Sequence, residues 1–260
     1  PLCLRIIKKK IKVLGVDIDE DKIRNLQNGK SYISDINNNK LSYFKKNQNN
    51  LSTKYEILKN VDIIIICLPT PLKNNLPDLS FLEKAFHEIK KTINKNQVVV
   101  LESTVYPGVT RNLSNSIQKK FKVGKNIFIG YSPERENPGD KTFSYNKTPK
   151  LISGLSKNCK KVVNKTYSGF TKNVVTVDSI EVAEMSKLLE NTYRSVNISL
   201  VNEIKIICQK LNIDVYDVIN AAATKNFGFQ KFVPGPGVGG HCIPIDPFYL
   251  SWIAKKNGYH

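Results

Sequence analysis

The chain has 260 residues, of which 40% are hydrophobic and 24% charged, a composition typical of a globular protein. It has no apolar run near the ~18 residues that a membrane-spanning helix needs, and its start, with lysines after the apolar part, does not match a signal peptide. The net charge is +18, yet 35 of the 40 basic residues are dispersed Lys, whereas nucleic-acid contacts favour Arg; we expect neither a nucleic-acid nor a membrane partner.

In chain order, short β-branched apolar runs alternate with helical patterns. Continuous apolar runs are typical of parallel strands that are buried on both faces. Strands are predicted at 12–18, 61–69, 97–103, 126–132 and 173–178, and helices at 19–29, 79–93, 110–121 and 156–167. This alternation predicts an α/β domain with a doubly wound parallel sheet. The polar stretch 37–50 is predicted to be a surface excursion.

The pattern changes near residue 178. One long helix is predicted at 179–211 and a second at 215–224, and the stretch from Pro247 resembles the start of another helix. We therefore expect an α/β domain over 1–177 and a helical domain over 178–260, with the long helix connecting them.

The five cysteines are far apart, odd in number and form no CxxC pair. Neither a zinc site nor a disulfide framework is predicted from that pattern. Free thiols are typical of a reducing compartment, so we expect a cytoplasmic protein without a bound metal. The cysteines are Cys3, Cys67, Cys159, Cys208 and Cys242.

The loop VPGPGVGGHCIPIDP (233–247) places four glycines and four prolines around Cys242. Glycine lets a backbone approach a ligand closely, and proline leaves little ordering entropy to be lost. A cysteine with lowered pKa in such a setting is a nucleophile. The alternative is a structural cysteine in a tight turn.

The sequence GVDID (15–19) ends the strand predicted at 12–18. An acid at such a strand end in a Rossmann-like fold accepts hydrogen bonds from the ribose of a dinucleotide, and Asp17 is the candidate. Its charge would repel a 2′-phosphate, which favours NAD over NADP. A turn or a helix cap is the alternative role for Asp17, and the glycine-rich phosphate loop does not precede it.

Five motifs and one helix, taken together, resemble the UDP-glucose/GDP-mannose dehydrogenase family of NAD-dependent nucleotide-sugar dehydrogenases. The chain is most similar to the branch that oxidises UDP-N-acetylhexosamines to uronic acids. The matching segments are GVDIDEDKI (15–23), CLPTP (67–71), ESTVYPGVT (102–110), YSPERENPGD (131–140), AEMSKLLENTYRSVNISLVNEI (183–204) and PGPGVGGHCIPIDP (234–247).

The resemblance implies how the chain is organised. Residues 1–177 would be the Rossmann-like NAD-binding domain without its glycine loop, and 178–260 the central domain. The family's C-terminal UDP-binding domain does not follow. We expect an internal fragment that is inactive as given, from a protein that binds a UDP-sugar and forms a homodimer through the long helix.

The resemblance also implies a mechanism with two hydride transfers. Cys242 would trap the intermediate aldehyde as a thiohemiacetal, which is oxidised to a thioester. Asp246 with Lys187 would activate the hydrolytic water, and Asn191, at i+4 from Lys187, would stabilise the oxyanion. The blander roles are a solvated helix face for Lys187 and Asn191 and a surface cap for Asp246.

Further site residues follow from the same resemblance. Thr104 would hold a water and Glu134 would lie in the active site. The residues that would contact NAD are Asp17, Lys22, Pro69, Thr70, Ser103 and Thr104. The residues that would contact the sugar nucleotide are Glu134, Arg135, Lys187, Asn191, Gly239, Gly240 and His241.

One departure from the family pattern concerns substrate choice. The UDP-glucose branch carries a second glutamate four residues after the Glu134 position, where this chain has Pro138. This favours the N-acetylhexosamine branch. UDP-glucose and GDP-mannose stay open as substrates, as does a catalytically dead Rossmann-type binding protein. Dehydrogenases that carry out a single oxidation share the domain plan but need no thiol, and the Cys242 loop distinguishes them.

Overall fold

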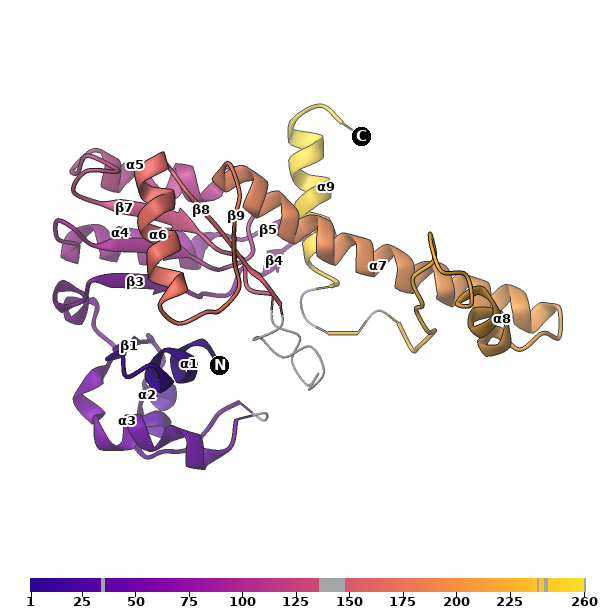
Figure 1. The fold of residues 1–260 in the computed structure, drawn as a ribbon, viewed down its shortest axis with the longest axis horizontal. Helices are drawn as coiled ribbons and strands as arrows, with labels where there is room; N and C mark the ends of the chain where they lie inside the picture. Colours follow the sequence, from indigo (N-terminus) through magenta and orange to yellow (C-terminus); the bar gives the residue numbers. More distant parts are fainter. Residues whose placement is uncertain (34–35, 136–147, 238, 241–242, 260) are drawn as a thin grey trace. The chain divides into compact units, whose positions relative to one another are not determined.

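The computed structural model describes residues 1–33, 36–135, 148–237, 239–240 and 243–259 (Figure 1). The chain divides into two compact units. We call the first the sheet unit, and it consists of Pro1–Pro69, Leu79–Ser103 and Pro107–Glu184. We call the second the helical unit, and it consists of Thr70–Asp78, Thr104–Tyr106 and Met185–His260.

The sheet unit is built on a five-stranded sheet of order β3-β6-β7-β8-β9 (Figure 1). Its strands are β3 (Ile63–Ile66), β6 (Val98–Leu101), β7 (Phe128–Tyr131), β8 (Lys150–Gly154) and β9 (Val174–Thr176). All neighbours pair in parallel except β7 and β8, which are antiparallel. The sheet is therefore mostly parallel, as the apolar runs predicted, with one reversal.

Helices cover both faces of this sheet, as the residues of β6 indicate. Val98 and Val100 pack with Ile152 of β8 and Val163 of α6 (Lys157–Ser168). Alternate strand residues point to opposite faces, so Leu101 and its neighbours of the same parity lie on the other face, where they are also buried. The remaining long helices of this unit are α4 (Ser80–Thr92) and α5 (Val109–Gln118), which contact each other.

The first sixty residues form a smaller layer within the sheet unit. Its elements are α1 (Leu2–Lys8), β1 (Gly15–Val16), α2 (Glu20–Gln27), η1 (Asn38–Leu41), α3 (Ser42–Lys46), η2 (Gln48–Asn50), β2 (Leu51–Ser52) and η3 (Tyr55–Asn60). β1 and β2 pair in parallel. The stretch predicted as a surface excursion contributes Leu41 and Phe44 to a buried cluster with Val13 and Ile23, so two apolar side chains give this polar segment a core.

The helical unit contains most of α7 (Ile180–Lys210), then α8 (Val215–Ala222) and α9 (Asp246–Lys256). A hairpin of β4 (Leu72–Lys73) and β5 (Leu76–Pro77) contacts α9. The Tyr249 hydroxyl donates to the Thr70 carbonyl at 3.1 Å. Val201, Cys208, Val215 and Ile219 pack α7 against α8. Among the helices of the described residues, none combines the length and apolarity that crossing a membrane requires.

The helices predicted from the sequence are all present, whereas β8 and the β4–β5 hairpin were not predicted. β8 reads KLISG and lacks an apolar run, because its Lys150 and Ser153 are polar and nevertheless buried. The hairpin is only two residues long on each side. The predicted doubly wound α/β fold is confirmed, and within it β8 runs antiparallel to β7. A strand without the apolar signal gave no clue to its direction.

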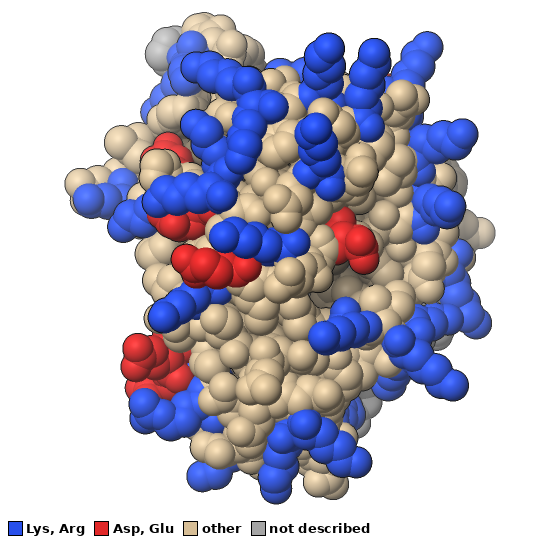
Figure 2. Space-filling model, turned by 90° about the vertical axis from the view of Figure 1, so that its left-hand side faces the viewer, with Lys and Arg blue, Asp and Glu red and all other residues tan. Residues whose placement is uncertain are grey.

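The surface charge is distributed as the sequence predicted. On the face drawn in Figure 2, Lys and Arg side chains are spread over the surface, and a smaller number of Asp and Glu side chains lie among them.

Candidate active site

Asp17 follows β1 in the sheet unit, where its backbone N–H donates to the Ser52 carbonyl at 3.3 Å. Asp19, and not Asp17, caps α2, because Asp19 Oδ1 accepts from the N–H groups of Asp21 and Lys22 at 3.0 and 3.2 Å. The Asp17 side chain is 34% exposed, with Lys22 Nζ at 3.7 Å from Oδ2. Asp19 thus takes the capping role, while Asp17 Oδ1 accepts from the Asp19 N–H at 3.0 Å and so supports a turn. The contact of Asp17 with the ribose of NAD stays a prediction.

The segments that follow β3 and β6 carry the other residues predicted to contact the cofactor. In the sheet unit, the backbone N–H of Leu68, the residue after Cys67, donates to Ser103 Oγ at 2.9 Å. In the helical unit, Thr70 Oγ1 donates to the Thr104 carbonyl at 2.8 Å. Pro69 stands between these two contacts in the chain. Ligands of open α/β sheets bind at the carboxyl ends of adjacent parallel strands, and β3 and β6 are such a pair.

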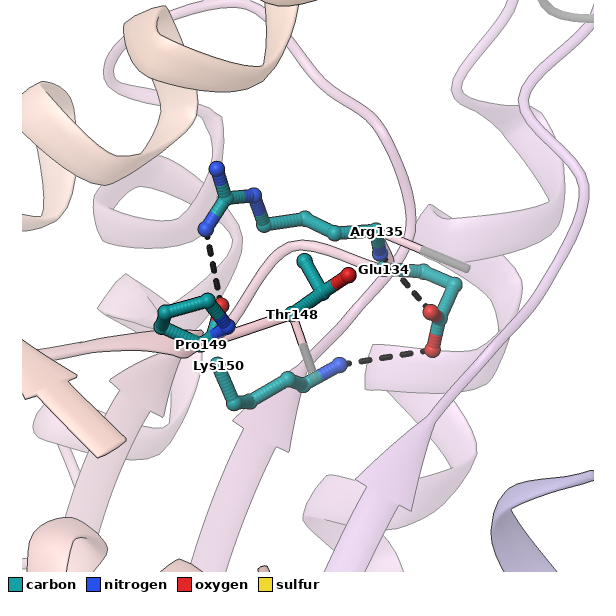
Figure 3. Close-up of a pocket in the computed structure, with 5 residues that line it drawn as sticks. All are labelled: Glu134, Arg135, Thr148, Pro149 and Lys150. Atoms are coloured by element: carbon teal, nitrogen blue, oxygen red, sulfur yellow. Dashed lines mark hydrogen bonds and ion pairs between the residues drawn. The ribbon is translucent and has the colours of Figure 1, made fainter. Parts of the chain in front are cut away.

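Glu134 follows β7 in the sheet unit and is 39% exposed. Its Oε1 accepts from the Arg135 N–H at 2.7 Å, and its Oε2 lies 3.3 Å from Lys150 Nζ (Figure 3). Lys150 Nζ also lies 2.8 Å from Glu102 Oε2, and both of these side chains are almost fully buried. The other oxygen of Glu102 accepts from the Tyr167 hydroxyl. Burial raises the pKa of Glu102, and the Lys150 ammonium opposes that shift.

A small pocket lies beside Glu134 (Figure 3). Its walls are Glu134, Arg135, Thr148, Pro149 and Lys150. The Arg135 guanidinium donates from Nη1 to the Pro149 carbonyl at 2.7 Å. The contact holds the guanidinium along one wall of the pocket, next to the predicted substrate residue Glu134.

Asn191 and Asp246, which are 55 residues apart in the chain, meet in the helical unit. Asn191 Nδ2 donates to Asp246 Oδ2 at 2.5 Å, and both side chains are buried. The two blander roles are therefore wrong, since Asn191 does not lie on a solvated helix face and Asp246 is not a surface cap. Lys187, one turn before Asn191 on α7, is half-buried.

The remaining predictions concern the glycine–proline loop. Gly239 and Gly240 adopt φ values of 62° and 73°, a left-handed conformation that glycine adopts without strain. Cys242 and His241 lie outside the described residues, so their predicted roles stay predictions. In the helical unit the structure pairs Asn191 with Asp246, and in the sheet unit it pairs Glu134 with Lys150.

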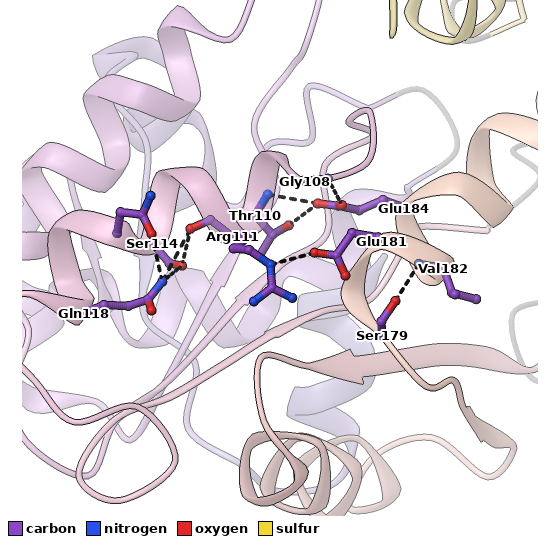
Figure 4. Close-up of polar contacts among 10 residues, drawn as sticks. Gly108, Thr110, Arg111, Ser114, Gln118, Ser179, Glu181, Val182 and Glu184 are labelled. Atoms are coloured by element: carbon purple, nitrogen blue, oxygen red, sulfur yellow. Dashed lines mark hydrogen bonds and ion pairs between the residues drawn. The ribbon is translucent and has the colours of Figure 1, made fainter. Parts of the chain in front are cut away.

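Glu184, near the start of α7, is a buried carboxylate that the sequence analysis missed. In the sheet unit it accepts from Gly108 N at 2.6 Å, Thr110 N at 2.9 Å and Thr110 Oγ1 at 2.7 Å (Figure 4). It therefore satisfies the first N–H groups of α5. Burial raises its pKa to about 7. A glutamate beside Ala183 on an otherwise apolar helix face was the available signal.

A mostly parallel five-stranded sheet with hydroxyl residues after β3 and β6, and an acid after β1 of the two-stranded sheet, are typical of a Rossmann-like dinucleotide-binding protein. Residues 1–171 match the sequence profile of the UDP-glucose/GDP-mannose dehydrogenase family, NAD binding domain. Residues 181–260 match the profile of that family's central domain. The chain belongs to the UDP-glucose/GDP-mannose dehydrogenase family, which confirms both the predicted family and its NAD cofactor.

Known relatives agree with this assignment. The chain is 44% identical over 257 residues to Protein CapL of Staphylococcus aureus, covering 96% of this chain and 59% of that protein. It is 38% identical over 267 residues to the UDP-N-acetyl-D-glucosamine 6-dehydrogenase of Pseudomonas aeruginosa, covering 100% of this chain and 62% of that protein. A solved structure of a UDP-D-ManNAc dehydrogenase from Pyrococcus horikoshii matches with a TM-score of 0.90 at 31% identity, over 98% of this chain and 62% of that one.

The chain spans about three fifths of the length of these relatives, as their coverage values of 59%, 62% and 62% state. What the whole protein catalyses is therefore a matter of proposal.

Proposed function

We propose that this chain forms the NAD-binding and central parts of an NAD-dependent UDP-N-acetylhexosamine 6-dehydrogenase. The observation that carries the proposal is the buried hydrogen bond between Asn191 and Asp246, because it joins two motifs to which the family resemblance assigns one reaction. The names of the relatives from Pseudomonas aeruginosa and Pyrococcus horikoshii support an N-acetylhexosamine as the sugar, as does Pro138 in the PERENPGD segment.

In this proposal the chain's own residues do three things. Lys187 and Asn191 stabilise the negative charge that develops on the oxygen at carbon 6. Cys242 adds to the aldehyde and forms a thiohemiacetal, whose oxidation gives a thioester on the same sulfur. Asp246, oriented by Asn191, takes a proton from the water that cleaves the thioester and frees the thiol. NAD, when bound, accepts one hydride in each of the two oxidations.

The test uses a chain lengthened at both ends to the size of its relatives, which we call the extended chain. UDP-N-acetylglucosamine, UDP-N-acetylmannosamine and UDP-glucose are each mixed with NAD, and NADH absorbance is followed. We expect the acetylated sugars to be oxidised, with two NADH formed per sugar. If UDP-glucose is preferred to both, the substrate part of the proposal is wrong and the thiol mechanism is still open.

The hydrolytic role of Asp246 has a separate test in the extended chain. Asp246→Asn is expected to give a burst of about two NADH per site, followed by turnover that is roughly 100- to 10,000-fold slower. Intact mass spectrometry should then find the sugar on Cys242. Asp217→Asn, at an exposed acid of α8, is the matched control. A mutant that binds both ligands but gives no burst would assign Asp246 to hydride transfer or to loop folding instead.

We also propose that the protein forms a homodimer through α7. The support is a stripe of exposed apolar side chains on that helix, which we call the α7 stripe. Its members are Leu189, Tyr193, Val196, Leu200 and Ile207. The spacing is mostly an alternation of four and three residues, which is typical of a seam between two helices. Sedimentation equilibrium of the extended chain should give twice the monomer mass, and a monomer at micromolar concentration would contradict the proposal.

A further inference from the structure

Four side chains in the sheet unit form a continuous line of polar contacts from the core to the predicted site. Tyr167 of α6 donates to Glu102, which follows β6. Glu102 pairs with Lys150 at the start of β8, and Lys150 reaches Glu134 after β7. The first three side chains are buried and only Glu134 is substantially exposed. The line therefore ends at the one member that a ligand could touch.

Lys150 pairs with two carboxylates, Glu102 and Glu134, although one would suffice to stabilise its buried ammonium. A buried ammonium is unfavourable unless it is paired and hydrogen-bonded. Glu102 meets that need at 2.8 Å with a side chain that is itself 1% exposed. The second carboxylate, Glu134, is 39% exposed and could be solvated by water instead. Lys150 thus has an additional contact that stability alone does not explain.

The contacts of Glu134 fix both of its oxygens. Oε1 accepts from the Arg135 N–H at 2.7 Å and Oε2 lies 3.3 Å from Lys150 Nζ. A carboxylate bound at both oxygens cannot rotate about its last torsion, and an ammonium at one oxygen favours its charged form. Figure 3 shows both contacts converging on the same carboxylate from the pocket wall.

We propose that Lys150 is a positioning residue for Glu134, holding its carboxylate in one orientation and in its anionic form toward the sugar nucleotide. The proposal rests on the proposed function for the identity of the ligand. Lys150 itself stays buried and acts only through Glu134. Tyr167 and Glu102 complete the arrangement, because Tyr167 donates to Glu102 and Glu102 holds the ammonium at 2.8 Å.

The test must separate positioning from charge balance in the core. Lys150→Met leaves Glu102 as an unpaired buried carboxylate and is expected to destabilise the fold. The double variant Glu102→Gln/Lys150→Met removes both charges and should recover most of the stability in urea unfolding. If Lys150 serves only charge balance, the double variant also recovers turnover. If Lys150 positions Glu134, kcat stays at least about tenfold below wild type while the KM for NAD is unchanged.

A double-mutant cycle on kcat in the extended chain then identifies Glu134 as the group through which Lys150 acts. Glu134→Gln should lower kcat at least about tenfold in the wild-type background. In the Glu102→Gln/Lys150→Met background, Glu134→Gln should lower kcat by less than about threefold, because the Glu134 carboxylate is no longer held in its orientation. Equal losses in both backgrounds would overturn the proposal. Lys160→Met, at a half-exposed lysine paired with Asp178, is the control.

A readout without substrate distinguishes failure of this inference from failure of the proposed function. The 13Cδ NMR signal of Glu134, assigned with Glu134→Gln, reports the environment and ionisation of that carboxyl group. It should shift in the Glu102→Gln/Lys150→Met variant and stay in place in Lys160→Met. An unchanged signal in the double variant overturns the positioning role. An extended chain that oxidises no UDP-sugar, with a shifted signal, would overturn only the proposed function.

Discussion

The interior of the sheet unit and the outer face of α7 in the helical unit differ in the kind of side chain that they hold. The sheet unit buries Glu102, Lys150 and Glu184 and pairs them with one another or with backbone groups. The helical unit leaves large apolar side chains exposed on α7, with Leu189 at 61% and Val196 at 60%. Buried charges that are internally paired indicate a core that is complete within the chain. An exposed apolar stripe indicates a surface that a second surface completes.

The largest effect on stability is expected when the buried ion pair between Glu102 and Lys150 in the sheet unit is broken. Glu102→Gln leaves the buried Lys150 without its closest carboxylate, and removing one partner of a buried ion pair typically lowers the free energy of unfolding by about 3–5 kcal/mol. Urea unfolding followed by circular dichroism measures the change. Glu181→Gln, which breaks the more exposed pair with Arg111, should lower it by less than about 1 kcal/mol. If the two variants lost equal amounts of unfolding free energy, burial would not determine how strongly an ion pair stabilises this protein.

The second effect concerns Glu184, whose pKa burial raises from 4.5 to about 7. Because the folded pKa is above the unfolded one, its contribution to stability is fully present below pH 4.5 and is lost as the pH rises through 7. That loss is on the order of 2–3 kcal/mol, and Glu184→Gln should remove it. The measurement is the difference in unfolding free energy between wild type and variant at pH 5, 6, 7 and 8.

The control for this pH dependence has the opposite sign. The hydrogen bond from Arg111 holds the pKa of Glu181 below its usual value, so its contribution is present at neutral pH and lost as the solution becomes acidic. Glu181→Gln should therefore remove stability at pH 7 and change little at low pH. A Glu184→Gln difference that is constant from pH 5 to pH 8 would show that burial does not perturb that carboxyl group.

The third prediction tests whether the helical unit forms a dimer, by measuring how stability depends on protein concentration. If the α7 stripe is completed by a second copy, each tenfold dilution of the extended chain should lower the apparent stability by about 1.4 kcal/mol per dimer. Thermal unfolding over a hundredfold range of protein concentration measures this. Val196→Lys/Leu200→Lys should abolish the concentration dependence, and Val175→Lys, at an exposed apolar residue of β9, should not. A melting temperature independent of concentration in wild type would contradict dimerisation.

The smallest effect is expected at two partly exposed acids of the sheet unit, Asp17 and Asp19, which should differ in whether they contribute to NAD binding or to stability. Asp17→Ala should weaken NAD binding by roughly tenfold or more, the loss typical of a hydrogen bond to a charged group, with little change in stability. Asp19→Ala removes the cap of α2 and should lower stability while NAD binding changes by less than about threefold. Isothermal titration calorimetry on the extended chain measures both, and the reverse ranking would assign the ribose to Asp19.

The sequence predicted those parts of the fold that have a strong apolar signal. The runs VDIIIICLP and QVVVLES predicted β3 and β6, and the apolar periodicity predicted α7. β8 was missed because two of its buried residues, Lys150 and Ser153, are polar and derive their burial from partners that lie far away in the sequence. Periodicity reports local burial and carries no information on such partners.

The candidate site shows the same division. Asn191 and Asp246 were predicted from motifs, and their contact could be found only in the structure, because 55 residues separate them. Asp17 does not cap α2, because Asp19 does, and its side chain forms a turn contact with the Asp19 N–H; its predicted contact with the ribose stays a prediction. Glu184 and Lys150 carried no motif at all, and their roles depend on the groups that surround them. The role predicted for Cys242, which lies outside the described residues, stays a prediction.

The antiparallel pairing of β7 and β8 has a consequence for how this protein can change over evolution. Because the two strands run in opposite directions, the segment from 132 to 149 joins two strand ends that lie at the same end of the sheet. Its two ends are joined by the Lys150–Glu134 ion pair and by the contact of Arg135 with the Pro149 carbonyl. Lengthening a loop that is clamped at its base adds only about 0.6 kcal/mol of closure entropy per doubling. Insertions or deletions between 135 and 148 would therefore cost little stability and leave the strand order unchanged.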